Sequence, residues 1–550
     1  MTPTAHYTRG GGRLTRKEAL KLGALGSAAL LLPLGRLART RSLADRVPTS
    51  RLPAPFSVPF VVPPIAPLAG RDEAARTDFY SITMREAPVG ILPGFPKTKI
   101  WGYNGITPGP TIVQRRDRTT VVRQVNGIRS PGHRHTSVHL HGNASEPQYD
   151  GYANDVSEPG YGKDYVYPNG QPARTLWYHD HGAHHTSENA YRGLAALYIT
   201  HDAHEESLGL PGGYHDPVAR TGHDVPLVLK DALFSQDGQL IFDRDEEGSL
   251  FGDVILVNGA PWPAMKVERR KYRFRVLNAS LSRSFKLALS TGEPMTVIGT
   301  DGGLVPRPVS TGSLRVGMAE RYEVVIDFAK YRVGQRVVLR NLDLPNNRDE
   351  KNTDRVMRFD VVGEASDPRN NDVPPRLAKP HDGAYDPMDL SPGQATHTER
   401  FVFERKNSKW VINGKTWEDI ERTGNTWNAV VCKDDEIEIW EFENKSGGWF
   451  HPIHVHLVDF RILSRTGGKS PGVLPYEVGP KDTAYVGENE TVRVLAKFGP
   501  RRGQYMMHCH NLVHEDHDMM TQFQVGTGGP RWDSARAVPA GELPPLVRRL

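Results

Sequence analysis

The densest group of metal-binding side chains in this 550-residue chain lies close to its C-terminal end. His508, Cys509 and His510 are followed by His514 and Met519, so a thiol, a thioether and several imidazoles fall within twelve residues. Soft sulfur donors combined with imidazoles suit copper, whereas calcium and magnesium prefer oxygen ligands. On a strand, side chains alternate between the two faces, so Cys509 would point one way and both neighbouring histidines the other. The tripeptide is therefore predicted to contact two different metal sites.

The Cys509 side of the tripeptide already holds most of a blue-copper electron-transfer site. Such a site uses one Cys, two His and a weak axial Met. His514 and Met519 follow Cys509 closely and supply one imidazole and the thioether. A second His must therefore come from elsewhere in the chain.

Three upstream His-x-His pairs have the spacing that places both rings on one face of a strand. These pairs are His139/His141, His179/His181 and His454/His456. Together with His508/His510 they offer eight imidazoles, enough for a cluster of three copper ions. His451 is left to complete the Cys509 site. A single pair could arise by chance, but four pairs with a Cys inside the last favour metal binding. The pair at 133 and 135 is set aside because an arginine separates its rings.

Segments along most of the chain after about residue 75 resemble the three-domain multicopper oxidases. Within that family the chain is most similar to the bilirubin oxidase branch, with bacterial spore-coat laccases and phenoxazinone synthase as related branches. The similar segments are WGYNGITPGPTI (101–112), SVHLHG (137–142), residues 150–198, GDVILVNGAPWP (252–263), KYRFRVLNASLSRSF (271–285), MAERYEVVIDF (318–328), GWFHPIHVHLVDF (448–460) and YMMHCHNLVHEDHDMM (505–520).

The resemblance implies four copper ions and divides the ligands among them. A type 1 copper would be held by His451, Cys509, His514 and Met519, and a type 2 copper by His139 and His454. Two type 3 coppers would be held by His141, His179, His181, His456, His508 and His510. A small reducing substrate would then lose single electrons at the type 1 copper, and dioxygen would be reduced to water at the other three.

The resemblance also assigns residues around the metals. Asp150 and Glu515 match carboxylates of the family that supply protons, and a structural hydrogen-bonding role is the alternative for each. Trp449, Arg405 and Asn511 match residues beside the type 1 copper, which implies substrate contact or tuning of the potential. Packing is the alternative role for Trp449. Bilirubin, aminophenols, phenols and metal ions all remain open as reducing substrates.

Chain length and strand pattern predict an all-β protein of about three domains. Short apolar runs separated by Gly and Pro are typical of Greek-key β-sandwiches, and the resemblance specifies three cupredoxin-like domains in tandem. The predicted domains are 52–201, 202–363 and 398–526, with a linker at 364–397 and a tail at 527–550. The middle domain has no His-x-His pair and is predicted to act as a spacer.

The first 46 residues have the composition of an export signal. A basic segment precedes a short apolar run, too short to span a membrane, and Arg16-Lys17 stands where a twin-arginine signal has two arginines. We therefore predict export to the cell envelope or medium of a bacterium, through the twin-arginine machinery or the ordinary secretory route.

Charge and cysteine content exclude other classes of protein. The whole chain has a formal net charge of +5, and residues 1–51 alone have a charge of +8, so residues 52–550 have a charge of −3. This charge gives no electrostatic case for nucleic-acid binding. Cys432 and Cys509 are the only cysteines, and Cys432 is predicted to be a small buried apolar residue.

Two interpretations rival that of a multicopper oxidase: a copper-free structural protein of the same fold and a simple electron carrier.

Overall fold

The computed structural model describes residues 45–132, 135–378, 385–469 and 472–546. Only the last two residues of the predicted export signal fall within these ranges. The described chain consists mainly of strands, which confirms the predicted all-β class. Its helices are α2 (Thr186–Arg192), α3 (Ala203–Ser207), α4 (Trp417–Glu421) and α5 (Leu512–Asp516). No described helix has the length and apolar character needed to cross a membrane.

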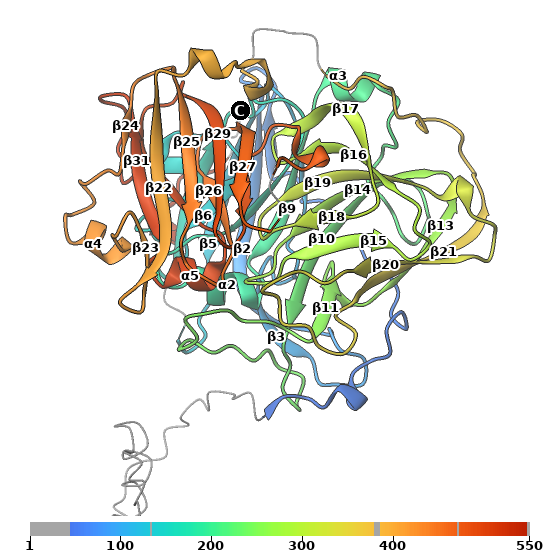
Figure 1. Ribbon diagram of the computed structural model, residues 1–550. Coiled ribbons are helices and arrows are strands. Elements are labelled where there is room, and N and C mark those ends of the chain that lie inside the picture. Colours follow the sequence, from blue (N-terminus) through green and yellow to red (C-terminus); the bar gives the residue numbers. More distant parts are fainter. Residues whose placement is uncertain (1–44, 133–134, 379–384, 470–471, 547–550) are drawn as a thin grey trace, which may run out of the picture. The chain divides into compact units, whose positions relative to one another are not determined.

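The strands form three pairs of sheets in order along the chain (Figure 1). In the first pair, one sheet contains β1 (Gly70–Asp72), β2 (Thr77–Val89), β3 (Thr98–Tyr103), β5 (Thr119–Asn126), β7 (Tyr161–Tyr167) and β32 (Val538–Pro539). The other contains β4 (Ile112–Arg115), β9 (Ala195–His201), β8 (Arg174–Asp180) and β6 (Val138–His141), in that order.

The second pair joins a seven-stranded and a five-stranded sheet. The larger runs through β12 (Ala260–Pro261), β11 (Val254–Val257), β10 (Asp224–Ala232), β14 (Lys271–Asn278), β19 (Arg321–Asp327), β16 (Met295–Thr300) and β17 (Gly303–Thr311). The smaller runs through β13 (Ala264–Arg269), β21 (Arg355–Glu364), β20 (Arg336–Asn341), β15 (Phe285–Leu289) and β18 (Leu314–Val316).

The third pair consists of two five-stranded sheets. One runs through β23 (Lys409–Ile412), β22 (His397–Lys406), β25 (Glu436–Asn444), β29 (Glu490–Phe498) and β27 (Phe460–Gly467). The other runs through β24 (Val431–Cys432), β31 (Met520–Val525), β30 (Gly503–Cys509), β26 (His451–Val455) and β28 (Thr483–Val486). Cys432 is buried and unbonded to Cys509, as predicted.

Sequence periodicity explains how exposed each strand is. β5 alternates strictly between buried and half-buried positions, which fits a strand with one face on the core. β8 is buried at all seven positions, because the second sandwich covers the face that the first leaves open: Thr175 in β8 donates its hydroxyl to Glu323 in β19. The sheet that carries His179 is thus held between two sandwiches.

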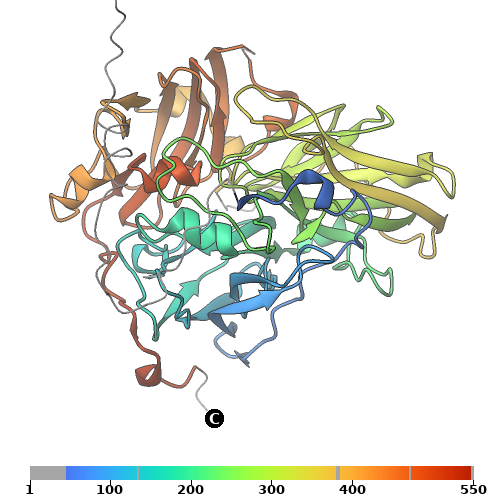
Figure 2. The ribbon, with the colours of Figure 1, turned by 90° about the horizontal axis from the view of Figure 1, so that it is seen from below.

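The C-terminal segment, predicted as a tail, contributes a strand to the first sandwich. β32 pairs antiparallel with β7, so the chain returns from the third sandwich to the first (Figure 2). Trp532 lies 4.4 Å from Tyr152, ring stacked on ring. The segment therefore joins the third sandwich to the first.

Candidate metal centre

The His-x-His pairs lie at the ends of four strands that converge. β6 and β8 pair antiparallel with His139 opposite His179, and β26 and β30 pair antiparallel with His454 opposite His508. His141 is the last residue of β6, whereas His181, His456 and His510 each follow directly after their strand. All eight side chains are at most 1% exposed. Two strand pairs from different sandwiches thus bring eight rings into one buried volume.

The eight rings divide into small groups whose nitrogen atoms lie within 4.8 Å of one another. One group brings His139 close to His454, with their Nε2 atoms 3.4 Å apart. The other two groups are His141/His179/His510 and His181/His456/His508. The resemblance implied the pairing of His139 with His454, but it gave the other six histidines as one set and did not divide them into these two groups.

The electrostatics of this volume favour a bound metal. Burial lowers the pKa of His139 well below its usual value, and neighbouring imidazoles lower it further, so the rings are neutral and keep a free lone pair. Ring nitrogens of His141, His179 and His510 have no hydrogen-bond partner among the described residues. Buried polar atoms are rarely left unpaired. Neutral imidazoles with unpaired nitrogens turned to a common centre are a suitable donor set for copper.

The second group of donors lies on the other side of the tripeptide. Cys509 Sγ is 3.3 Å from His451 Nδ1 and 3.7 Å from His514 Nδ1. Met519 is fully buried in the same apolar cluster as Cys509, and its backbone bonds to both Cys509 and His514. Burial raises the pKa of the Cys509 thiol, so a bound cation is needed to hold it as a thiolate. The donors fit a blue-copper site.

Asn511 and two tryptophans surround the imidazole of His514. Asn511 caps α5 and places its Nδ2 3.1 Å from His514 Nε2. Trp449 is half-buried and meets the His514 ring edge to face at 5.4 Å. Trp410, which the sequence had not singled out, stacks on the same ring at 3.9 Å. Arg405 lies one layer further out, 5.1 Å above the Trp410 ring.

Ser446 is a further neighbour that the sequence did not indicate. Its hydroxyl lies 2.7 Å from His451 Nε2. The buried amide of Asn444 donates to the carbonyls of Trp449 and Gly487, which fixes the loop between β25 and β26. A serine in a Gly-rich loop gives no signal of this role, because the contact depends on how the loop folds back over the strand.

The two predicted carboxylates contact the eight-histidine group directly. Asp150, after the short turn Pro147–Tyr149, places Oδ2 2.7 Å from His456 Nδ1. Glu515 in α5 places Oε2 2.9 Å from His508 Nδ1 and Oε1 3.6 Å from His181 Nε2. Burial raises the pKa of Asp150 well above its usual value and that of Glu515 to about 7. Both groups can hold a proton next to the cluster near neutral pH.

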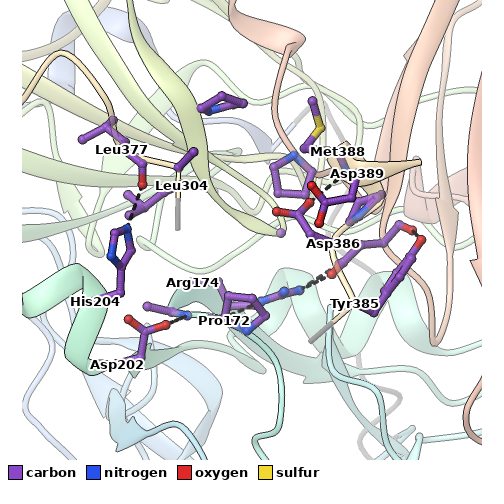
Figure 3. A pocket seen from close by; sticks show the side chains of 17 residues that line it. Pro172, Arg174, Asp202, His204, Leu304, Leu377, Tyr385, Asp386, Met388 and Asp389 are labelled. Carbon is purple, nitrogen blue, oxygen red and sulfur yellow. Dashed lines mark hydrogen bonds and ion pairs between the residues drawn. The ribbon is translucent and has the colours of Figure 1, made fainter. Parts of the chain in front are cut away.

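A cavity of about 270 Å³ lies at a junction of the three sandwiches (Figure 3). Two of its charged side chains, Arg174 and Asp459, pair with each other. Arg174 donates to both carboxylate oxygens of Asp459 at 2.8 Å, and the Tyr385 hydroxyl donates to the Asp459 carbonyl at 2.9 Å. His204 donates to the Leu377 carbonyl. These contacts tie Leu377 to the first sandwich and Tyr385 to the third, and we interpret the cavity as a structural junction.

Comparison with known proteins agrees with the fold and the site. Three multicopper oxidase family models match residues 88–205, 223–353 and 389–529. The chain therefore belongs to the multicopper oxidase family, and its three sandwiches are cupredoxin-like. It is a copper-dependent oxidase that reduces dioxygen.

Individual proteins of this family are similar to the chain over most of its length. Bilirubin oxidase from Albifimbria verrucaria is 42% identical over 491 residues, covering 86% of this chain and 81% of that protein. Laccase from Bacillus subtilis (strain 168) is 34% identical over 511 residues, covering 82% and 95%. Among solved structures, laccase from Pediococcus acidilactici has a TM-score of 0.73 at 30% identity, covering 86% of this chain and 95% of that one. McoA multicopper oxidase from Aquifex aeolicus has a TM-score of 0.74 at 27% identity, covering 86% and 99%.

Proposed function

We propose that this oxidase binds one type 1 copper through His451, Cys509, His514 and Met519, and three further copper ions among the eight paired histidines. The type 2 copper takes His139 and His454. The type 3 coppers take two triads, His141/His179/His510 and His181/His456/His508. One observation supports this division above all: Cys509 has its sulfur in one donor group while the rings on either side of it lie in the other.

The copper ions supply reversible one-electron chemistry, which lets single electrons from a reducing substrate accumulate for the four-electron reduction of dioxygen. The chain supplies the connection. The backbone of His508, Cys509 and His510 runs without a break from the type 1 donors to both triads, so an electron crosses through a few covalent bonds. The protein also keeps water away from the proposed copper sites, because the side chains of all the proposed ligands are buried.

The proposed substrates are phenols, aminophenols or bilirubin-like tetrapyrroles. The half-buried Trp449 meets His514 edge to face, and the exposed Arg405 lies over Trp410. An aromatic surface with a cation at its rim suits a flat, electron-rich, anionic or phenolic molecule. Asn511 orients His514 from the other side.

Asp150 and Glu515 are proposed to deliver protons. Asp150 Oδ2 can pass a proton beside His456, and Glu515 Oε2 can do so beside His508. Four protons are required for each dioxygen reduced to two waters.

We further propose that residues 1–46 direct export, by the twin-arginine route in view of Arg16-Lys17, to the cell envelope or the medium.

Replacing Cys509 with Ser tests the proposed electron path. Ser keeps the size of the side chain but cannot act as a thiolate ligand, so the blue colour and the oxygen uptake with a phenolic dye should both disappear. Circular dichroism should remain that of the parent protein. If the variant consumes oxygen as fast as the parent, the proposed path is wrong. A parent protein that is blue but takes up no oxygen would instead favour an electron carrier.

A further inference from the structure

The second sandwich supplies a buried arginine to the histidine cluster, although it holds no His-x-His pair. Arg321, the first residue of β19, is fully buried and reaches towards Asp482, which immediately precedes β28 in the third sandwich. We propose that Arg321 is a positioning residue: it holds the Asp482 carboxylate against His141, and so fixes which ring nitrogen His141 turns to copper. This inference rests on the proposed copper cluster.

All five N–H groups of the Arg321 guanidinium have an acceptor. Nε donates to the Thr175 carbonyl at 3.0 Å, Nη1 to the Ala319 carbonyl at 3.1 Å, and Nη2 to the Asp301 carbonyl at 3.1 Å. The two remaining N–H groups form a fork on Asp482, with Nη1 2.7 Å from Oδ1. The acceptors come from all three sandwiches. Only arginine carries five donors in a fixed plane, so this arrangement sets the orientation of the guanidinium completely.

Asp482 passes this orientation on to two histidines. Its Oδ1 lies 3.0 Å from His141 Nε2 and accepts from that N–H, while its backbone carbonyl accepts from His454 Nδ1 at 2.9 Å. The opposite nitrogen of each ring is then left for the metal. For His141 this is Nδ1, which has no hydrogen-bond partner among the described residues. A carboxylate that fixes the tautomer of a metal-binding His in this way raises its affinity for the metal.

The backbone of Asp482 is held from the second sandwich as well. The amides of Asp482 and Thr483 donate to Asp301 Oδ2 at 3.3 and 3.2 Å. Lys481 pairs with the same oxygen at 2.9 Å and with Glu320 at 3.0 Å. The second sandwich therefore fixes both the main chain and the side chain of Asp482.

Gly142 shows how closely Arg321 and Asp482 approach the His139-Leu140-His141 strand. It has φ +88°, and a Cβ atom at this position would lie 2.7 Å from both Arg321 Nη2 and Asp482 Oδ2. A side chain there would push the ion pair away from His141. The glycine that ends the first histidine motif is thus explained by the ion pair behind it.

The test compares Arg321→Met with Arg275→Met in the full-length, copper-loaded protein. Arg275 is a matched control: it is equally buried in the second sandwich and bonds to Asp224, Glu323 and the Thr175 hydroxyl, but it does not contact Asp482. Copper content per chain, the type 2 electron paramagnetic resonance signal and the type 1 absorbance are measured together. Thermal unfolding of each copper-free protein reports general damage.

Arg321→Met should weaken copper binding at the cluster, or lower turnover, by about 10- to 100-fold, the range typical for lost partners of metal-binding residues. It should lower the number of copper ions bound by the cluster, because His141 is a proposed type 3 ligand. It should also alter the type 2 signal, because the Asp482 carbonyl holds the proposed type 2 ligand His454. The type 1 band should stay in place. Arg275→Met should keep both signals. Arg321→Lys, which has three donors instead of five, should restore the type 2 signal only in part.

A double variant separates positioning from general stability. If Arg321 acts through Asp482, then Arg321→Met should add less than about 2-fold to the loss already caused by Asp482→Asn. An unchanged type 2 signal and copper content in Arg321→Met would overturn the inference, and so would equal losses in Arg275→Met. A parent protein that binds no copper at the cluster would instead refute the proposed function.

Discussion

Trp410 and Trp449 differ in how they contact the same imidazole. Trp410 is 1% exposed, stacks flat on His514 and donates its indole N–H to the Glu247 carbonyl at 2.7 Å, so it supports the ring from within. Trp449 is half-buried and meets His514 with its edge. At the scale of single residues, the first therefore controls the geometry of the type 1 site and the second the approach of a substrate.

Substitution of Trp449 separates these roles. Trp449→Ala should raise KM for a phenolic substrate by about 2- to 10-fold, which corresponds to the loss of one aromatic contact. The type 1 absorbance should stay, since Trp449 holds none of the proposed ligands. Steady-state kinetics with bilirubin, an aminophenol and a simple phenol would also rank the substrates. An unchanged KM for all three would exclude Trp449 from substrate binding.

At the scale of the elements, local sequence predicted the parts of the site that depend on local geometry. Strands such as β5 follow from alternating apolar residues, and the histidine pairs follow from the two-residue repeat of a strand. The partners Arg321 and Asp482 were not predicted. They lie 161 positions apart, and nothing near either residue indicates that they meet. Trp410 lies on β23, and its contact with His514 depends on how that strand packs against α5.

The turn Pro475–Glu477 is an element whose contribution to stability depends on pH. Burial alone would raise the pKa of Glu477, but Arg465 and Arg315 outweigh it and lower the pKa to about 2. Glu477 is 1% exposed, and its Oε1 is 2.7 Å from Arg465 Nη2. A carboxyl whose folded pKa is depressed contributes stability above its unfolded pKa and loses it as pH falls through the folded value.

Glu477→Gln should therefore destabilise the protein at pH 7 by a few kcal/mol, about 3, because Arg465 is left without its charged partner. The difference in stability between parent and variant should shrink as pH falls from about 5 towards 2. Denaturant unfolding of the copper-free proteins at several pH values would measure it. A difference that stays constant over this range would contradict the assigned pKa.

At the scale of the whole molecule, the proposed cluster joins the first sandwich to the third. The proposed type 2 and type 3 ligands come in equal parts from the first and third sandwiches, and the second sandwich contacts both of them through Arg321 and Asp301. β32 adds a backbone connection from the third sandwich to the first. Metal binding and the docking of the sandwiches should therefore depend on each other.

Removal of copper tests this coupling. Copper binds the folded protein and so shifts the unfolding equilibrium towards it, and chelation should lower the Tm by more than about 5 °C. Cys509→Ser, which removes only a type 1 ligand, should retain most of this shift when loaded with copper. Differential scanning calorimetry of both proteins, with and without chelator, gives the comparison. Equal Tm values with and without copper would argue against a cluster shared between sandwiches.

The most direct test of the proposed copper sites is anomalous diffraction at the copper absorption edge from crystals of the copper-loaded protein. Four peaks per chain are expected. One should lie among His451, Cys509 and His514, and three among the eight paired histidines, with His508 and His510 bound to the metals on the side away from Cys509 Sγ. A peak at the Cys509 site alone, or histidine pairs without copper in an active enzyme, would contradict the proposed copper sites.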